Sequence, residues 1–264
     1  MVKHILVKEL KLNLKSFLIW SLSVGLLGLA CILLYSSMQG EMKDMADAFS
    51  NMGAFSDAFG MSTLSIATLK GYFATEIGAV HGLGGGMFAA ILAIGIISKE
   101  EEGHSGEFLF SLPVSRSKVL IAKGLCVAVY LVFFTFICGL LYALGFAALG
   151  EELPTAQFMT FMARQMLMNF EVAGICFGIS AISWKNRMGM GIALAMFFYF
   201  YDVIGRVVPD LKDYLFVGPY SYVNAAEIFT DADTPVKAIC ISVAVTVCGV
   251  FFAFFYYNKR DLAG

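Results

Sequence analysis

The sequence predicts an all-α, polytopic membrane protein with six transmembrane helices, and three observations support this. Hydrophobic residues make up 59% of the 264 residues and charged residues only 14%, whereas a soluble domain carries about 25% charged residues. The apolar residues form long blocks and do not alternate with polar ones. Lys and Arg gather in alternate segments between these blocks. Length alone would predict one or two soluble domains, but the block pattern excludes that interpretation.

Six blocks are long enough to cross a bilayer, for which a helix needs about 20 apolar residues. They are residues 17–38, 77–98, 119–148, 158–183, 188–208 and 236–257. The first block follows a basic segment, as the apolar part of a signal peptide does. Its apolar stretch is too long for that, and no small-residue cleavage site follows it. We therefore expect this segment to be retained as a transmembrane helix. Residues 17–264 are expected to form one six-helix transmembrane domain.

Residues 1–16 are expected to form an amphipathic helix in the membrane interface. Leu6, Leu10 and Leu14 lie near one helical face and lysines lie on another. This pattern is typical of helices that rest on lipid headgroups. The alternative is that the segment simply begins the first transmembrane helix.

The distribution of basic residues predicts the orientation, because cytoplasmic segments of membrane proteins are enriched in Lys and Arg. Twelve of the 18 basic residues fall on the side that holds both termini: Lys3, Lys8, Lys11, Lys15, Lys99, Arg116, Lys118, Lys123, Lys185, Arg187, Lys259 and Arg260. Five fall on the other side: Lys43, Lys70, Arg206, Lys212 and Lys237. Both termini are therefore expected in the cytoplasm, as an even number of spans requires, with residues 39–75 and 209–235 as outer loops.

Several motifs of soluble chemistry are absent. The sequence contains neither a GxxxxGK[ST] phosphate loop nor an HExxH zinc motif. All six cysteines fall within predicted transmembrane helices and none forms a CxxC pair, so neither a zinc site nor a disulfide framework is indicated. An intramembrane hydrolase is disfavoured, because His81 and His104 are the only histidines beyond the N-terminal tail.

The ionisable residues expected to be buried within predicted transmembrane helices are His81, Arg164, Glu171 and Asp202. Such groups are costly in a bilayer and mark functional sites by default. Arg164 and Glu171 share a helical face but lie about 10 Å apart along the axis, too far for direct contact. Asp202 and Arg206 are four residues apart and can pair. Two interpretations stay open: a polar translocation path or proton relay, and structural pairing or snorkelling.

Glycines recur at four-residue intervals in two of the predicted helices. Gly78, Gly82 and Gly86 lie in the second, and Gly174 and Gly178 in the fourth. Small residues at this spacing let helix backbones approach closely in lipid. The pattern fits either a seam between two subunits or ordinary packing within one.

Residues 98–123, SKEEEGHSGEFLFSLPVSRSKVLIAK, form the most specific segment and join the second and third predicted helices. Glutamates favour the positive N-terminal end of a helix, Pro113 ends it, and Arg116 and Lys123 are expected to anchor the next helix in the headgroups. The helix expected over residues 100–112 is amphipathic and can dock into a cleft of a soluble partner. The residues assigned to this contact are Glu100, Glu101, Glu102, Glu107, Phe108, Leu109, Leu112, Pro113 and Arg116. The alternative is a solvated loop whose charges only maintain topology.

This segment resembles the ATP-binding-cassette type-2 permeases. Their usual form runs from acidic residues through Gly-Thr to Glu-Phe-Leu-Leu-Ser-x-Pro-Val-Ser-Arg and a Lys that enters the third helix. The matching residues are Glu100, Glu101, Glu107, Phe108, Leu109, Ser111, Pro113, Val114, Ser115, Arg116 and Lys123. His104-Ser105 replaces the Gly-Thr. The basic N-terminal helix, six spans, long first outer loop and Pro-Tyr-Ser-Tyr at residues 219–222 extend the resemblance over the whole chain.

The resemblance implies the permease subunit of an ATP-binding-cassette exporter. Such a permease pairs with a second copy or a homologous permease, and each binds a separate ATPase through the coupling helix after its second span. ATP and Mg would be bound by the ATPase, so no cofactor, metal or catalytic residue is expected on this chain. Substrate would pass along the interface between the two permeases.

The expected location is the bacterial cell membrane, with lipid as the surrounding partner. No nucleic-acid partner is expected, since the net charge is −2 and the chain has no basic arm. The alternative function is an ATP-independent channel, scramblase or scaffold.

Overall fold

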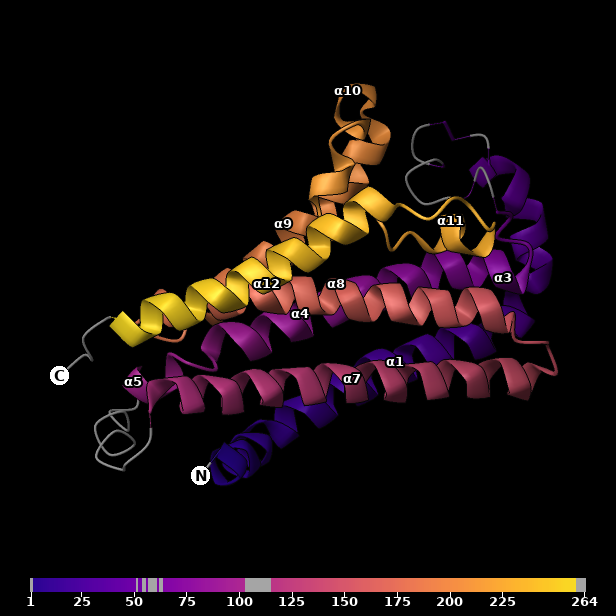
Figure 1. The fold of residues 1–264 in the computed structure, drawn as a ribbon. Coiled ribbons are helices and arrows are strands. Elements are labelled where there is room, and N and C mark those ends of the chain that lie inside the picture. The colour runs from indigo at the N-terminus through magenta and orange to yellow at the C-terminus, as the bar shows by residue number, and fades with distance from the viewer. Residues whose placement is uncertain are drawn as a thin grey trace.

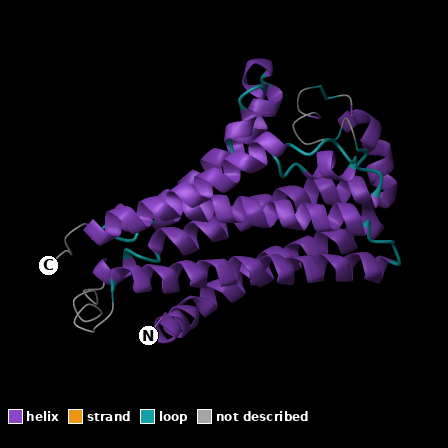
Figure 2. Cartoon of the chain, viewed as in Figure 1, coloured by secondary structure: helices purple, strands orange, loops and turns teal. Residues whose placement is uncertain are grey.

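The computed structural model describes residues 2–50, 52, 53, 56, 61, 64–102 and 115–259. Within these residues every long element is an α-helix and no strand occurs (Figure 2). Six helices are long and apolar enough to cross a membrane. These are α1 (Val2–Ser50), α4 (Gly78–Gly95) with the turns that precede it, α7 (Arg116–Leu149), α8 (Thr155–Ile182), α9 (Met188–Val207) and α12 (Val236–Lys259). The prediction of an all-α protein with six membrane-spanning helices is confirmed.

Helix α4 lies at the centre of the bundle. It contacts α1, α7, α8 and α9, while α1 packs along α7 and α8 packs along α12 (Figure 1). Over half of the apolar windows of α4 and α8 is buried, against 17% for α9 and α12. The inner helices therefore carry the intrachain contacts, whereas α9 and α12 turn most of their apolar surface outward.

The two ends of the bundle differ in what they hold. One end carries the N-terminal part of α1, the short helix α5 (Lys99–Glu102), the start of α7 and the end of α12 (Figure 1). We call it the basal end. The other, distal end carries α3 (Leu69–Tyr72) and α11 (Ala225–Phe229) (Figure 1). Both ends of the described chain thus lie on the side that the positive-residue count assigns to the cytoplasm.

The first two helices extend beyond the hydrophobic blocks that predicted them. Helix α1 continues to Ser50, through residues that the sequence assigned to the first outer loop. The second spanning helix begins at Leu69 and not at residue 77. Hydropathy marks only the hydrocarbon thickness, whereas helical hydrogen bonds continue through the headgroup region. Helix α1 also shows no break near residue 16, and the interfacial position of residues 1–16 stays a prediction.

A π-helical turn, Phe73–Ile77, joins α3 to α4 and places Phe73 in the core. The ring of Phe73 is fully buried. Five aromatic rings lie with their centroids 5.4–6.0 Å from it: Tyr142, Phe146, Phe158, Phe161 and Phe229. These rings come from α7, α8 and α11, so the turn fixes the distal end of the bundle around one residue.

The recurrent glycines pack within this chain. A side chain at Gly86 would overlap the Tyr220 hydroxyl. At Gly174 the backbone of α8 meets α12, where a side chain at Gly249 would overlap the Gly174 carbonyl. Close approach of helix backbones requires small residues at such points. These contacts favour packing within the subunit over a seam between subunits for these glycines.

Candidate functional site

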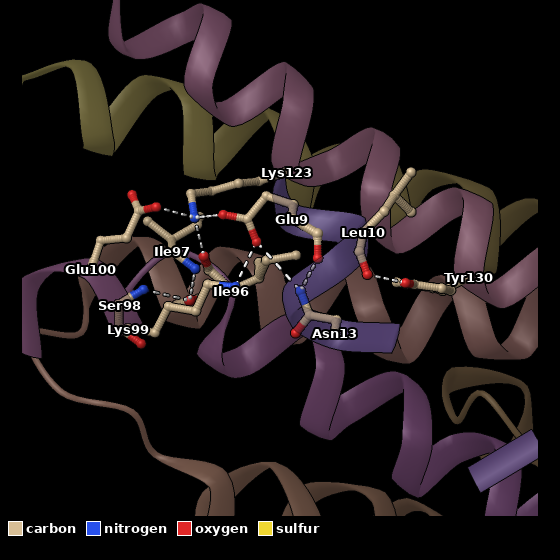
Figure 3. A network of polar contacts seen from close by, with 11 residues as sticks. Glu9, Leu10, Asn13, Ile96, Ile97, Ser98, Lys99, Glu100, Lys123 and Tyr130 are labelled. Carbon is tan, nitrogen blue, oxygen red and sulfur yellow. Dashed lines mark hydrogen bonds and ion pairs between the residues drawn. The ribbon is translucent and has the colours of Figure 1, made fainter. Parts of the chain in front are cut away.

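Four charged side chains form a buried cluster at the basal end (Figure 3). The Glu9 carboxylate lies 2.5 Å from Lys99 Nζ and 2.8 Å from Lys123 Nζ. Lys123 Nζ also lies 3.3 Å from the Glu100 carboxylate. Glu9 and Lys123 are fully buried. Two acids and two bases thus balance in charge, which a low-dielectric site requires.

Backbone contacts hold the cluster in place. Lys123 Nζ donates a 2.6 Å hydrogen bond to the Ile96 carbonyl, just past the end of α4, where a cation is favourable. The Asn13 amide donates to the Glu9 carbonyl at 2.8 Å. Tyr130 donates its hydroxyl hydrogen to the Leu10 carbonyl (Figure 3). The cluster therefore joins α1 and α7 to the chain at the point where residues 98–123 begin.

Helix α8 is attached to the same point. The Ser180 hydroxyl accepts hydrogen bonds from the backbone N–H groups of Ile97 and Ser98, at 3.1 and 3.3 Å. These two amides follow the last turn of α4, where backbone groups need partners outside the helix. The base of the segment is thus bonded to three different helices.

Two sequence expectations change here. Lys123 was expected among the headgroups, and this is wrong: its side chain has no exposed surface. The side chain of Glu100 also faces inward, toward Lys123. Glu9 was missed altogether. Its signal was present, because an acid at position 9 shares the apolar face with Leu6, Leu10 and Asn13 at helical spacing.

The remaining residues of the expected coupling set are only partly described. Glu102 is exposed, and its carboxylate accepts a 3.0 Å hydrogen bond from the backbone of Asn186, between α8 and α9. Arg116 donates to the Tyr257 carbonyl at 3.2 Å. Outside the described residues lie Glu107, Phe108, Leu109, Leu112 and Pro113, together with the side chain of Glu101. Their part in coupling stays a prediction.

The intramembrane ionisable residues do not converge on one site. His81 is fully buried and shares a 3.0 Å hydrogen bond with the Tyr142 hydroxyl. The rings of Phe134 and Phe161 flank it at 5.5 and 5.9 Å. No group of three or more potential metal ligands occurs among the described residues. His81 therefore sits in an aromatic environment between α4, α7 and α8.

Glu171 faces protein, as expected for a carboxylate in a transmembrane helix. Its side chain accepts a 2.9 Å hydrogen bond from the Tyr222 hydroxyl, whose oxygen lies 2.7 Å from Ser242 Oγ. Burial, and next the Glu171 carboxylate, raise the pKa of the Tyr222 hydroxyl well above its usual value. The hydroxyl therefore stays protonated and donates, which ties the loop before α12 to α8.

Asp202 and Arg206 pair as their four-residue spacing predicted, at 2.8 Å. Arg206 also lies 2.6 Å from Glu227 of α11. Arg164 donates instead to the Tyr222 carbonyl at 3.4 Å and does not reach Glu171. A cavity of about 70 Å³ beside Asp202 has mixed polar and apolar walls. These charges thus brace the distal loop, and the structural interpretation accounts for their geometry.

Six apolar helices and a basal end held by buried ion pairs define a multi-pass membrane protein. A family model described as ABC-2 family transporter protein matches residues 4–262. The chain belongs to this family and is a transmembrane permease component of an ATP-binding-cassette transporter, not itself catalytic. A comparison with individually curated proteins finds no match.

Proposed function

We propose that this permease exports a substrate, driven by ATP hydrolysis on a separate ATPase that docks on residues 100–112. The observation that carries the proposal is the basal charge cluster. Glu100 lies at the start of the docking segment and pairs with Lys123 of α7. Lys123 in turn pairs with Glu9 of α1 inside the bundle. A displacement of the segment therefore acts on α1 and α7 as well as on α4.

The family membership supports the remaining parts of this proposal. A permease component without its own phosphate loop needs an ATPase partner. Pairing with a second permease would complete a substrate path between two copies. In α9 and α12 only 17% of the most apolar stretch is buried inside the chain. Their exposed apolar surface is available for contact with a second permease and with lipid.

The proposal is tested on the tagged permease purified from native membranes with its bound ATPase. Phe108→Ala is expected to weaken the affinity for the ATPase about thirtyfold and so to reduce the copurified ATPase, since truncation of a buried aromatic anchor commonly costs about 2 kcal/mol or more. Phe136→Ala serves as the control, because Phe136 is an exposed residue of α7. Insertion into the membrane should be equal for both variants. Equal ATPase recovery from the two would contradict the proposal.

Charge reversal offers a second test, and the structure decides where to place it. Glu100→Lys would also remove an ion pair with Lys123, so its effect would mix docking with folding. Glu102 is exposed and its carboxylate accepts one exposed hydrogen bond, from Asn186. Glu102→Lys is expected to slow assembly with the ATPase in a salt-dependent way, and Glu102→Gln, which keeps an acceptor oxygen for Asn186, is the matched control. A purified permease that transports substrate with no ATPase present would instead support the channel or scramblase alternative.

A further inference from the structure

An apolar groove runs along the bundle between α7 and the α8–α12 pair. It encloses about 330 Å³, and nearly all of its lining is apolar. Its floor includes Gly124 and Gly174, and its walls include Phe177 and Phe254. The absence of a side chain on Gly124 keeps the groove open, since a Cβ there would meet only the Phe177 ring, at 3.8 Å.

The groove reaches from the basal end to the middle of the bundle. Along α7 it is lined from Leu120 to Ala128, and along α12 from Thr246 to Phe254. Either stretch covers about 12 Å at the helical rise of about 1.5 Å per residue. One leaflet of a bilayer is about 15 Å thick in its hydrocarbon part, half of the ~30 Å core. The groove therefore matches the depth of a single leaflet.

Polar and basic residues follow the groove lining at the basal ends of α7 and α12. Ser117 of α7 and Asn258 of α12 are hydrogen-bonded to each other at 3.2 and 3.1 Å. The next residue on each helix is an exposed lysine, Lys118 and Lys259. Lys259 Nζ lies 4.0 Å from the centroid of the Phe255 ring, so its charged end stays at the edge of the apolar surface.

A second apolar groove, of about 410 Å³, lies between α7 and α8 nearer the distal end. The connection that follows α7 there carries two acids, Glu151 and Glu152. Acidic residues repel an anionic headgroup, whereas basic residues between transmembrane helices attract one. Of these two grooves, the basal one is about as long as one leaflet is thick and has basic residues near its basal end.

We propose that the basal groove binds an anionic phospholipid, with one acyl chain between α7 and α12 and the phosphate beside Lys118 and Lys259. The lipid belongs to the leaflet on the basal side. Its acyl chain fills the space that Gly124 leaves open, and its headgroup meets the two lysines. The site lies between helices of one chain and does not depend on the docking of an ATPase.

Native mass spectrometry of the purified, detergent-solubilised protein tests this site. The probes are dioleoylphosphatidylglycerol and dioleoylphosphatidylcholine, added at equal concentrations. The wild-type protein should retain phosphatidylglycerol in preference to phosphatidylcholine. Lys118→Gln and Lys259→Gln should each weaken phosphatidylglycerol retention about fivefold, the effect of one basic residue near an anionic surface. Equal retention of the two lipids by the wild type would overturn the proposal.

Gly124→Leu should abolish the retained lipid because its side chain fills the groove. The matched control is Gly189→Leu, at an exposed position where an added Cβ meets nothing within 4 Å. Circular dichroism tests whether both variants are folded. Retention of phosphatidylglycerol by folded Gly124→Leu at the level of the control would refute the site. If Gly124→Leu does not fold, the two lysine variants provide the test. Retention of phosphatidylglycerol by both lysine variants at the wild-type level would then refute the proposed site.

Discussion

Removal of one partner from the basal charge cluster should destabilise the permease strongly. Lys123 Nζ and the Glu9 carboxylate are 2.8 Å apart and neither side chain is exposed. At an effective dielectric constant of about 20, two unit charges at this distance attract by about 6 kcal/mol, before the cost of their desolvation. Removing one member of a buried pair typically costs about 3–5 kcal/mol. Here Glu9 would keep Lys99, and Lys123 would keep Glu100, as a second partner, so the loss should lie at the lower end, about 3 kcal/mol. We expect that loss for Glu9→Leu and for Lys123→Leu.

The double variant, with leucine at both positions 9 and 123, separates pairing from packing. Removal of one acid and one base together keeps the cluster neutral, since Lys99 and Glu100 remain. The double variant should therefore be less destabilised than the sum of the single variants. We expect a difference of about 2–3 kcal/mol, the upper range for residues in one ion-pair network. The free energy of unfolding is measured by SDS titration of the purified protein in mixed micelles.

Lys11→Leu provides the control for the removal of a charge from α1, because Lys11 is exposed. Its effect should stay within about 0.5 kcal/mol, as for other surface substitutions. If the single variants at Glu9 and Lys123 behave like this control, or if their effects are additive in the double variant, the cluster does not hold the basal end together. The mechanical part of the proposed coupling would then lose its support.

Three further predictions concern the distal loop, the α8–α12 contact and the orientation. Tyr222→Phe should destabilise the protein by about 1–3 kcal/mol, since it removes the hydroxyl that donates to the buried Glu171 carboxylate; an unchanged SDS unfolding curve would contradict this. Gly249→Ala should cost about 1–3 kcal/mol by overpacking against the Gly174 carbonyl, and wild-type stability would show that α12 can shift freely. On a cysteine-free background, a membrane-impermeant thiol reagent should label Ser105→Cys only in opened cells. Labelling in intact cells would contradict the predicted orientation.

Local sequence patterns predicted the contacts between residues close in the chain. The pairing of Asp202 with Arg206 follows from their four-residue separation, because such residues are neighbours on any α-helix. Similarly, the six spans follow from the length of the apolar blocks, since every backbone polar group in a bilayer must be paired within a helix or barrel. The family resemblance depended on one contiguous segment, residues 98–123, and the family match confirms it.

Only the tertiary structure decided which distant charges meet. Glu9 and Lys123 are 114 residues apart, and no periodicity relates them. In the sequence nothing separates Lys123 from Arg116 as an expected headgroup anchor, since both lie in the first turns of the same helix. Its burial arises because α1 packs along α7 and brings the one acid of its apolar face to the same depth. A charge in a membrane helix can reach water or find a partner, and the packing of the neighbouring helices determines which of these occurs.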